Sequence, residues 1–298
     1  MEQTPWEFLD DRGRLATAPH TPVRLIAYIQ AGAALFDHGI RPVGLFGSGH
    51  DGAAPDAAKA GDLPLDGVAY LGSGPAVDAD GVSAAGPDLV VAVTYGSDQI
   101  YGLDPDTAKH MEERVPVVVL DVGQGRSFDE VRDRFDALAR SLGAVPDPSA
   151  GPALAAARAR LGSAAGGAAA GGAARARVLA LSPAGPDSVH LARPDAWPDL
   201  RALSERGVQL VEPAPGAGLN WSTTGWADAG RLEPDVVLVD VRSNAHPVER
   251  LRGAAHWDAI EAGARLLPWN PEIPPSAAAH TRFLDAVAEA LEAAPPSS

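Results

Sequence analysis

The chain has 298 residues and a formal net charge of -15, and 46% of its residues are hydrophobic. Its length suits two globular domains, and its negative charge argues against a nucleic-acid surface, which depends on clustered Lys and Arg. Because the sequence contains no cysteine, disulfides, thiolate nucleophiles and thiolate zinc sites are excluded. No apolar run approaches the roughly 20 residues that a membrane-spanning helix requires.

The first half of the chain alternates short apolar stretches with helical patterns. A first helix is predicted over residues 31–38, because Gly39 stands where a helix-ending glycine is expected. The clearest helix signal covers residues 127–142, where Ser127 and Glu130 form a capping box and one face is apolar. The stretches predicted as strands are residues 23–28, 42–46, 67–71, 89–94 and 116–121.

The middle of the chain is rich in alanine and glycine. A helix is predicted over residues 153–161, and the low-complexity run that follows, residues 162–174, is interpreted as a pliable connector. Its glycines do not form a phosphate-binding loop, because no Gly-Lys-Ser or Gly-Lys-Thr sequence ends the run.

The second half repeats the alternation of strands and helices. Pro234-Asp235 runs into an unbroken apolar strand as Pro87-Asp88 does in the first half, which is typical of a parallel strand buried on both faces. Strands are predicted over residues 177–181, 209–212, 236–241 and 265–268, helices over 197–206, 254–262 and 281–292, and a loop over 213–226.

This alternation predicts an α/β fold with two doubly wound parallel-sheet lobes. We expect an N-terminal lobe over residues 1–146, a connecting helix and Ala/Gly linker over 147–174, and a C-terminal lobe over 175–298. Open parallel sheets bind ligands beyond the carboxyl ends of their strands, so a ligand cleft is expected between the two lobes.

One motif, Gly47-Ser48-Gly49-His50-Asp51-Gly52, has the glycine spacing of a dinucleotide fingerprint. A fingerprint has to open an amphipathic helix, whereas Pro55 interrupts the following stretch, so nucleotide binding is not expected. Ser48 lacks the glycine two positions earlier that a hydrolase nucleophile elbow requires, since Phe46 stands there. The histidines are scattered and form no metal-binding motif.

Aromatic residues are scarce, at 5%, and several stand in or beside the predicted strand-end loops. Aromatic rings supply stacking area at small entropic cost, and arginine guanidinium groups bind anionic oxygens. As a group these residues favour a cleft for a sizeable, oxygen-rich ligand; the alternative is that they cover loop and lobe surfaces. They are Tyr28, Tyr95, Tyr101, Trp221, Trp226 and Trp269, together with Arg126 and Arg242.

The order and spacing of five segments carry a resemblance to a known family. The segments are residues 6–14 (Trp-Glu-Phe-Leu-Asp-Asp-Arg-Gly-Arg), 22–28 (Pro-Val-Arg-Leu-Ile-Ala-Tyr), 39–47, 87–91 and 115–120. Together they resemble the iron-siderophore substrate-binding proteins of ABC importers, of the type with two lobes joined by a stiff helix. The resemblance covers almost the whole chain and is more specific for the fold than for the ligand.

The resemblance implies non-catalytic binding of a ferric siderophore of hydroxamate-like type, for delivery to an ABC permease. It also implies that the siderophore's own oxygens coordinate the iron, so that the protein needs no intrinsic cofactor and no metal ligands. A monomer is expected for such a shuttling protein. The residues expected to contact the ligand are Tyr28, Ser48, Tyr95, Tyr101, Arg126, Trp221, Arg242 and Trp269.

Members of this family usually carry a glutamate on each lobe that docks against permease arginines. Asp80, seven residues before Pro87, stands at the first of these positions as a shorter acid. At the second position the matching residue is Ala227, and Asp228 stands next to it. Asp80 and Asp228 are therefore the predicted docking residues, with a weaker match in the second lobe.

Alternative functions stay open at this point. One is a cytoplasmic small-molecule binding module or sensor of the same fold with an altered ligand, and haem or a corrinoid is a rival ligand within the family. An enzyme would need a nucleophile, base or metal set that the sequence does not provide. Residues 1–14 contain no basic and apolar leader and no lipid-accepting Cys. An extracytoplasmic lipoprotein is expected if a signal has been trimmed, and a cytoplasmic protein if Met1 is the native start.

Overall fold

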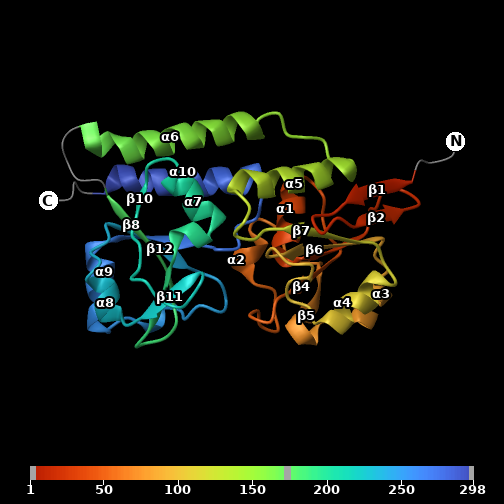
Figure 1. Ribbon diagram of the computed structural model, residues 1–298, viewed down its shortest axis with the longest axis horizontal. Helices are drawn as coiled ribbons and strands as arrows, with labels where there is room; N and C mark the ends of the chain where they lie inside the picture. Colours follow the sequence, from red (N-terminus) through yellow and green to blue (C-terminus); the bar gives the residue numbers. More distant parts are fainter. Residues whose placement is uncertain (1–4, 171–175, 295–298) are drawn as a thin grey trace. The chain divides into compact units, whose positions relative to one another are not determined.

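A computed structural model describes residues 5–170 and 176–294 (Figure 1). The chain forms two compact units: unit 1 is Met1–Pro148 with Glu272–Ala279, and unit 2 is Ser149–Pro271 with His280–Ser298. The sequence assigned residues 272–279 to the C-terminal lobe, whereas the structure places them in unit 1. We call Glu272–Ala279 the returning segment, because the chain re-enters unit 1 there and then leaves it again.

Unit 1 is built on a five-stranded parallel sheet with the strand order β5-β4-β3-β6-β7. Residues of β3, β4 and β6 are buried throughout, as expected for strands covered on both faces, and the five predicted strands are confirmed. The bounds are β3 Leu25–Tyr28, β4 Gly44–Gly47, β5 Ala69–Ser73, β6 Leu89–Thr94 and β7 Val117–Asp121.

The two longer helices of unit 1 confirm the predicted ones. Helix α1, Ile29–Asp37, packs against β3, β4, β6 and helix α5, Phe128–Ser141. At the start of α5 the Ser127 hydroxyl accepts from the backbone N–H of Glu130 at 3.2 Å, and the Glu130 carboxylate accepts from the N–H of Ser127 at 2.7 Å. The predicted capping box is therefore present.

Three short helices of unit 1 were not predicted from the sequence. They are α2 Ala57–Ala60, α3 Ala79–Ala84 and α4 Pro105–Glu112, and a 3₁₀ turn spans Gly74–Ala76. Each α-helix begins after an aspartate, Asp56, Asp78 or Asp104, whose carboxylate accepts from backbone N–H groups of the first turn. Such caps stabilise helices too short to form by propensity alone.

An N-terminal hairpin of β1, Trp6–Leu9, and β2, Leu15–Ala18, was also missed by the sequence reading. Its turn pairs with the edge strand β7: the N–H of Asp11 donates to the carbonyl of Val119 at 3.0 Å, and the N–H of Asp121 donates to the Asp11 carboxylate at 2.8 Å. This contact covers a sheet edge that would otherwise offer unpaired backbone groups.

Unit 2 contains a mixed sheet of order β11-β9-β8-β12-β13, with β10 paired to β8. Strands β8, β10, β12 and β13 are parallel, but β9 and β11 are antiparallel, so the prediction of a purely parallel second sheet is wrong. The predicted loop over residues 213–226 contains β11 and the start of a helix. The bounds are β8 Arg177–Pro183, β9 Val189–Ala192, β10 Gln209–Leu210, β11 Trp221–Thr224, β12 Val236–Asp240 and β13 Arg265–Trp269.

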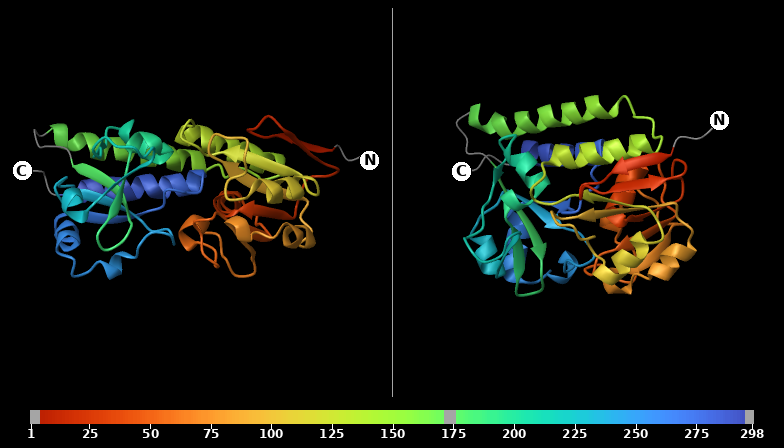
Figure 2. Two further views of the ribbon diagram at one scale, coloured as in Figure 1. Left: turned by 60° about the horizontal axis from the view of Figure 1, so that its bottom comes forward. Right: turned by 45° about the vertical axis from the view of Figure 1, so that its right-hand side comes forward.

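The helices of unit 2 include one that the sequence cut short. Helix α6 runs over Ala150–Ala170, so residues 162–170 are helical and not a pliable connector; residues 171–174 lie outside the described residues. Leu154, Ala157 and Leu161 are buried at helical spacing. Helix α6 runs alongside α10, Ala277–Ala293 (Figure 2), and Arg160 donates to the Glu292 carboxylate of α10. The other helices are α7 Pro198–Ser204, α8 Trp226–Gly230, α9 Ala255–Gly263 and α10 Ala277–Ala293, with 3₁₀ turns at Pro194–Ala196 and Val248–Arg250.

None of the helices within residues 5–170 and 176–294 has the length and apolar character needed to cross a lipid bilayer.

Substituting Ser127→Ala removes the capping hydroxyl of α5 and should lower the free energy of unfolding by about 1 kcal/mol. Urea denaturation checks this. The matched control is Ser204→Ala at the end of α7, where the serine is exposed and a change within about 0.5 kcal/mol is expected. Equal effects of the two substitutions would contradict a stabilising role for the capping box.

Candidate functional site

The carboxyl ends of the unit 1 strands bring four predicted ligand residues to one edge of the sheet. Tyr28 ends β3, Ser48 follows β4, and Tyr95 follows β6, with Tyr101 in the loop after it. Strands β4 and β6 lie on opposite sides of β3, so the winding direction changes here. In parallel sheets this switch point is where ligands bind.

Three of these side chains form a row that we call the tyrosine stack: Tyr28, Tyr101 and Tyr95. The rings of Tyr28 and Tyr101 meet edge to face with centroids 5.7 Å apart, and those of Tyr101 and Tyr95 with centroids 4.6 Å apart. Tyr28 is 0% exposed, whereas Tyr95 is 39% exposed. The stack therefore runs from the core to the surface, where Tyr95 is the exposed member.

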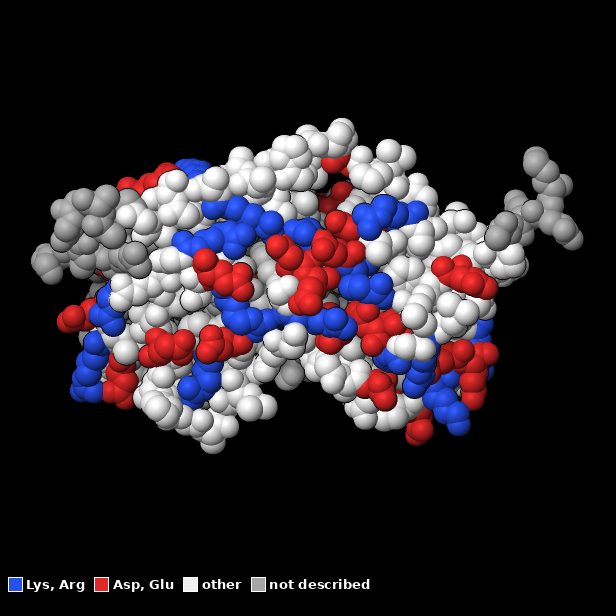
Figure 3. All heavy atoms as spheres, turned by 45° about the horizontal axis from the view of Figure 1, so that its top comes forward, with Lys and Arg blue, Asp and Glu red and all other residues white. Residues whose placement is uncertain are grey.

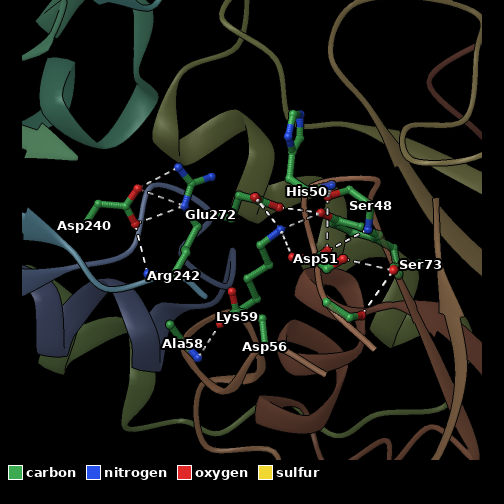
Figure 4. Close-up of polar contacts among 12 residues, drawn as sticks. Ser48, His50, Asp51, Asp56, Ala58, Lys59, Ser73, Asp240, Arg242 and Glu272 are labelled. Atoms are coloured by element: carbon green, nitrogen blue, oxygen red, sulfur yellow. Dashed lines mark hydrogen bonds and ion pairs between the residues drawn. The ribbon is translucent and has the colours of Figure 1, made fainter. Parts of the chain in front are cut away.

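A buried ion cluster contacts Tyr28, and Figure 4 shows its charged members, Lys59, Asp51 and Glu272. The Lys59 ammonium group is 2.7 Å from the Asp51 carboxylate and 2.8 Å from the Glu272 carboxylate, and these side chains are at most 2% exposed. The Tyr28 hydroxyl donates to Glu272 at 2.5 Å. We call Lys59, Asp51, Glu272 and the Tyr28 hydroxyl the Lys59 cluster; sequence reasoning missed it, because its members come from distant parts of the chain.

The charge states of the Lys59 cluster follow from burial and from the neighbouring charges. Burial alone would lower the pKa of Lys59, but the Glu272 and Asp51 carboxylates raise it above its ordinary value, so the ammonium group stays charged. Burial, followed by the negative charge of Glu272, raises the pKa of Tyr28 well above its ordinary value. The phenol therefore stays protonated and remains a hydrogen-bond donor.

Ser48 is hydrogen-bonded to the Lys59 cluster and is almost fully buried. It is 1% exposed, and its N–H and hydroxyl both donate to the Asp51 carboxylate, at 2.6 and 3.1 Å. A Cβ at Gly47 would lie 2.6 Å from the Tyr70 hydroxyl and 2.7 Å from an Asp51 oxygen. The glycine-rich motif of residues 47–52 thus packs Asp51 tightly beside Ser48.

Each of the two predicted ligand-binding arginines pairs with the aspartate that ends the strand before it. Arg126 lies 3.3 Å from the carboxylate of Asp121, the last residue of β7, and its side chain is 36% exposed. In unit 2, Arg242 lies 2.8 Å from the carboxylate of Asp240, the last residue of β12, and its side chain is 11% exposed. Each positive charge is therefore offset locally.

Unit 2 carries an aromatic cluster of Trp197, Trp221 and Trp269. Trp197 and Trp221 lie with centroids 5.0 Å apart, and Trp269 lies 5.8 and 6.0 Å from them. Trp269 is buried and donates through Nε1 to the Asp199 carboxylate at 2.6 Å. Trp221 is partly exposed and is the member available for contact; the sequence reading did not single out Trp197.

Trp226 does not join this cluster, contrary to the expectation that it stands in a loop. It begins α8, is buried, and packs against Trp257 with centroids 5.2 Å apart. Its Nε1 donates to the carbonyl of Gly185 at 3.0 Å. Both contacts are made by a buried side chain inside unit 2, so Trp226 has a structural role.

A pocket of about 510 Å³ opens beside Trp221, entirely within unit 2. Its walls come from strand β11, from Arg193 and from the loop at residues 214–218. Arg193 fixes this loop, since its Nε donates to the carbonyl of Gly218 at 2.8 Å.

The chain matches no protein-family model and no curated protein sequence. It is 29% identical to DesE, a ferric-siderophore receptor protein from Streptomyces coelicolor, with a TM-score of 0.85 over 99% of this chain and 100% of that one. It also resembles the Vibrio cholerae siderophore binding protein FhuD bound to Fe3+-Desferal, at 20% identity and a TM-score of 0.63 over 92% of this chain and 99% of that one. The siderophore periplasmic binding protein from the fuscachelin gene cluster of Thermobifida fusca shares 18% identity and a TM-score of 0.64, over 91% and 96% of the two chains.

The similarity to DesE over nearly the whole of both chains supports a relationship to the siderophore substrate-binding family. The more distant structures share its fold, which confirms the two-lobed α/β prediction.

The two acids predicted to dock a permease are both exposed. The Asp80 side chain is 77% exposed, and hydrogen bonds from Arg114, at 2.5 Å, and then from His110 lower its pKa. Asp228, in the first turn of α8, is 58% exposed and pairs with Arg231. Each acid thus already has an arginine partner within its own unit.

Across the residues that the structure describes, no three His, Asp or Glu side chains converge as metal ligands.

Replacing Lys59 by methionine leaves Asp51 and Glu272 buried without their cation. We expect the free energy of unfolding to fall by about 3–5 kcal/mol, measured by urea denaturation at pH 7. Lys109→Met is the matched control, because Lys109 is the other lysine of the chain and is exposed. A loss at Lys59 no larger than at Lys109 would show that the cluster does not stabilise unit 1.

Asp199 makes a second testable contribution, because burial raises its pKa from the ordinary 3.8 to about 6. A carboxyl whose pKa is raised on folding stabilises the protein at low pH and loses that contribution as pH rises from about 4 to about 6. The unfolding free energy of the protein relative to an Asp199→Asn variant should therefore fall by about 3 kcal/mol over this range. A pH-independent difference would show that Asp199 does not titrate in this way.

Proposed function

We propose that this protein binds a ferric siderophore of hydroxamate type without altering it chemically and delivers it to an ABC importer. The observation that carries the proposal is the similarity to a ferric-siderophore receptor protein over nearly the whole of both chains. The iron is cargo, coordinated by the siderophore's own oxygens. The protein contributes stacking surface, for which Tyr95 and Trp221 are the accessible rings.

The charge at the strand ends supports the hydroxamate class. A ferric tris-hydroxamate centre is neutral, whereas a ferric tris-catecholate centre is trianionic. Arg126 and Arg242 are each offset by an aspartate, and the Lys59 cluster holds two carboxylates against one ammonium group. Strand ends whose positive charges are offset in this way favour a neutral or cationic ligand over a trianion. Away from these residues, Figure 3 shows Lys and Arg interspersed with Asp and Glu on one face of the molecule.

The proposal places the protein outside the cytoplasm, as a monomer that meets a permease through Asp80 and Asp228. Both acids are exposed, and exposed carboxylates are suited to pairing with arginines of a partner. Because Arg114 and Arg231 already hold them, docking exchanges one arginine partner for another.

Tryptophan fluorescence tests the ligand class, since the chain has six tryptophans. The purified protein is titrated with Fe3+-Desferal, a ferric tris-catecholate, haem and cobalamin, with iron-free Desferal as the control. We expect saturable quenching by the ferric hydroxamate at submicromolar concentration and none by the control. Saturation by haem or cobalamin alone, or no response to any siderophore, would overturn the proposal.

Tyr95→Ala and Trp221→Ala remove the two accessible rings and should each weaken the affinity for Fe3+-Desferal by about tenfold or more, because exposed aromatic anchors dominate such contacts. Calorimetry measures this without relying on Trp221 fluorescence. Val145→Ala is the control, since Val145 is 88% exposed and lies between α5 and α6. Unchanged affinity in both ring variants would show that these residues do not contact the ligand.

A further inference from the structure

The returning segment is fastened to unit 1 along its length, although the residues on either side of it belong to unit 2. Gln30 donates through Nε2 to the carbonyl of Ile273 at 3.0 Å, and the Ser276 hydroxyl donates to the carboxylate of Asp37. Glu272, its first residue, is 2% exposed. The returning segment thus places the carboxylate of Glu272 in the interior of unit 1.

Glu272 uses its two carboxylate oxygens for two different partners. One oxygen accepts from the Tyr28 hydroxyl at 2.5 Å, and the other lies 2.8 Å from the Lys59 ammonium group. Lys59 in turn is held by Asp51 at 2.7 Å. Hydrogen bonds to a charged acceptor are among the strong ones, so Glu272 holds the Tyr28 hydroxyl in place. Glu272 is in turn held by Lys59, and Lys59 by Asp51.

The orientation of Tyr28 decides where the rest of the tyrosine stack lies. Its ring is packed edge to face on both sides, against Phe46 at 5.8 Å and against Tyr101 at 5.7 Å. Tyr101 then carries Tyr95, the exposed ring, at 4.6 Å. Edge-to-face contacts depend on ring orientation, so a rotation of Tyr28 about its own axis is transmitted outward through Tyr101.

We propose that Glu272 and Lys59 are positioning residues for the ligand: they hold the Tyr28 hydroxyl so that the tyrosine stack presents Tyr95 at the surface. Tyr28 itself is a positioning residue and not a ligand contact, because it is 0% exposed. The inference rests on the proposed function for its consequence on siderophore affinity, but not for its consequence on the tyrosines.

The chain offers a direct probe, because its four tyrosines all lie in unit 1: Tyr28, Tyr70, Tyr95 and Tyr101. Protein labelled with 2-fluorotyrosine gives one fluorine signal per tyrosine, and single Tyr→Phe variants assign them. Affinity for Fe3+-Desferal is measured on the same samples, and circular dichroism with a thermal melt confirms that each variant is folded.

Three variants break or keep the bond between Tyr28 and Glu272. Tyr28→Phe keeps the ring and removes the hydroxyl, and Glu272→Ala removes the acceptor. Both should shift the Tyr95 and Tyr101 signals and weaken the affinity by about tenfold, because the exposed ring is then no longer held in one orientation before the ligand binds. Glu272→Gln keeps an acceptor oxygen and should restore both signals and most of the affinity, a rescue that general destabilisation would not produce.

Tyr70→Phe is the matched control. The Tyr70 hydroxyl donates to the carbonyl of Gly52 at 3.4 Å, outside the bond between Tyr28 and Glu272, so its removal should leave the Tyr95 and Tyr101 signals and the affinity unchanged. If Glu272→Ala does not fold, Tyr28→Phe alone decides.

A folded Tyr28→Phe protein with unshifted Tyr95 and Tyr101 signals and unchanged affinity would overturn the inference. If the wild-type protein binds no siderophore, the proposed function fails separately. The fluorine spectra of the variants then decide, without any ligand, whether the Lys59 cluster positions the tyrosines.

Discussion

Lys59 carries a positive charge into the interior of unit 1, and it is stable there because Asp51 and Glu272 meet it at hydrogen-bonding distance. This one interaction joins three parts of the chain: the loop after β4, the short helix α2 and the returning segment. Removing Lys59 would leave two buried carboxylates without a cation, so the three parts are stable only together. The tyrosine stack is built directly on this junction through the Tyr28 hydroxyl.

The exposed aromatic rings of the two units are supported in similar ways. In unit 1 the accessible ring, Tyr95, is the end of a buried polar and aromatic series. In unit 2 the accessible ring, Trp221, packs against Trp197 and Trp269. Trp269 in turn donates a hydrogen bond to the buried Asp199. In both cases the exposed ring belongs to an aromatic cluster that contains a buried ring whose polar atom has a carboxylate partner. Rigid support of this kind lowers the entropy lost when a ligand stacks on the ring.

Much of the fold could be predicted from the sequence because the decisive signals are local. Unbroken β-branched strands such as residues 89–94 and the capping box at Ser127 and Glu130 need no knowledge of distant residues. The tail of α6, residues 162–170, could not be predicted, because its glycines lower helix propensity and its packing, as at the buried Ala165, depends on distant residues. The Lys59 cluster could not be predicted either, because no residue near Lys59 in the sequence indicates that Glu272 is its partner. The sequence predicted Tyr95, Tyr28 and Ser48 alike as ligand contacts because all three stand at strand ends. In the structure only Tyr95 is exposed, whereas Tyr28 and Ser48 are buried.

The proposed function requires the protein to bind an intact ferric hydroxamate in preference to anionic complexes. Native mass spectrometry of the full chain with an equimolar mixture of Fe3+-Desferal and a ferric tris-catecholate tests this preference directly. We expect one Fe3+-Desferal per chain, bound and released with its iron and its ligand mass unchanged. A complex with the catecholate alone, or iron transferred from the siderophore to the protein, would contradict it.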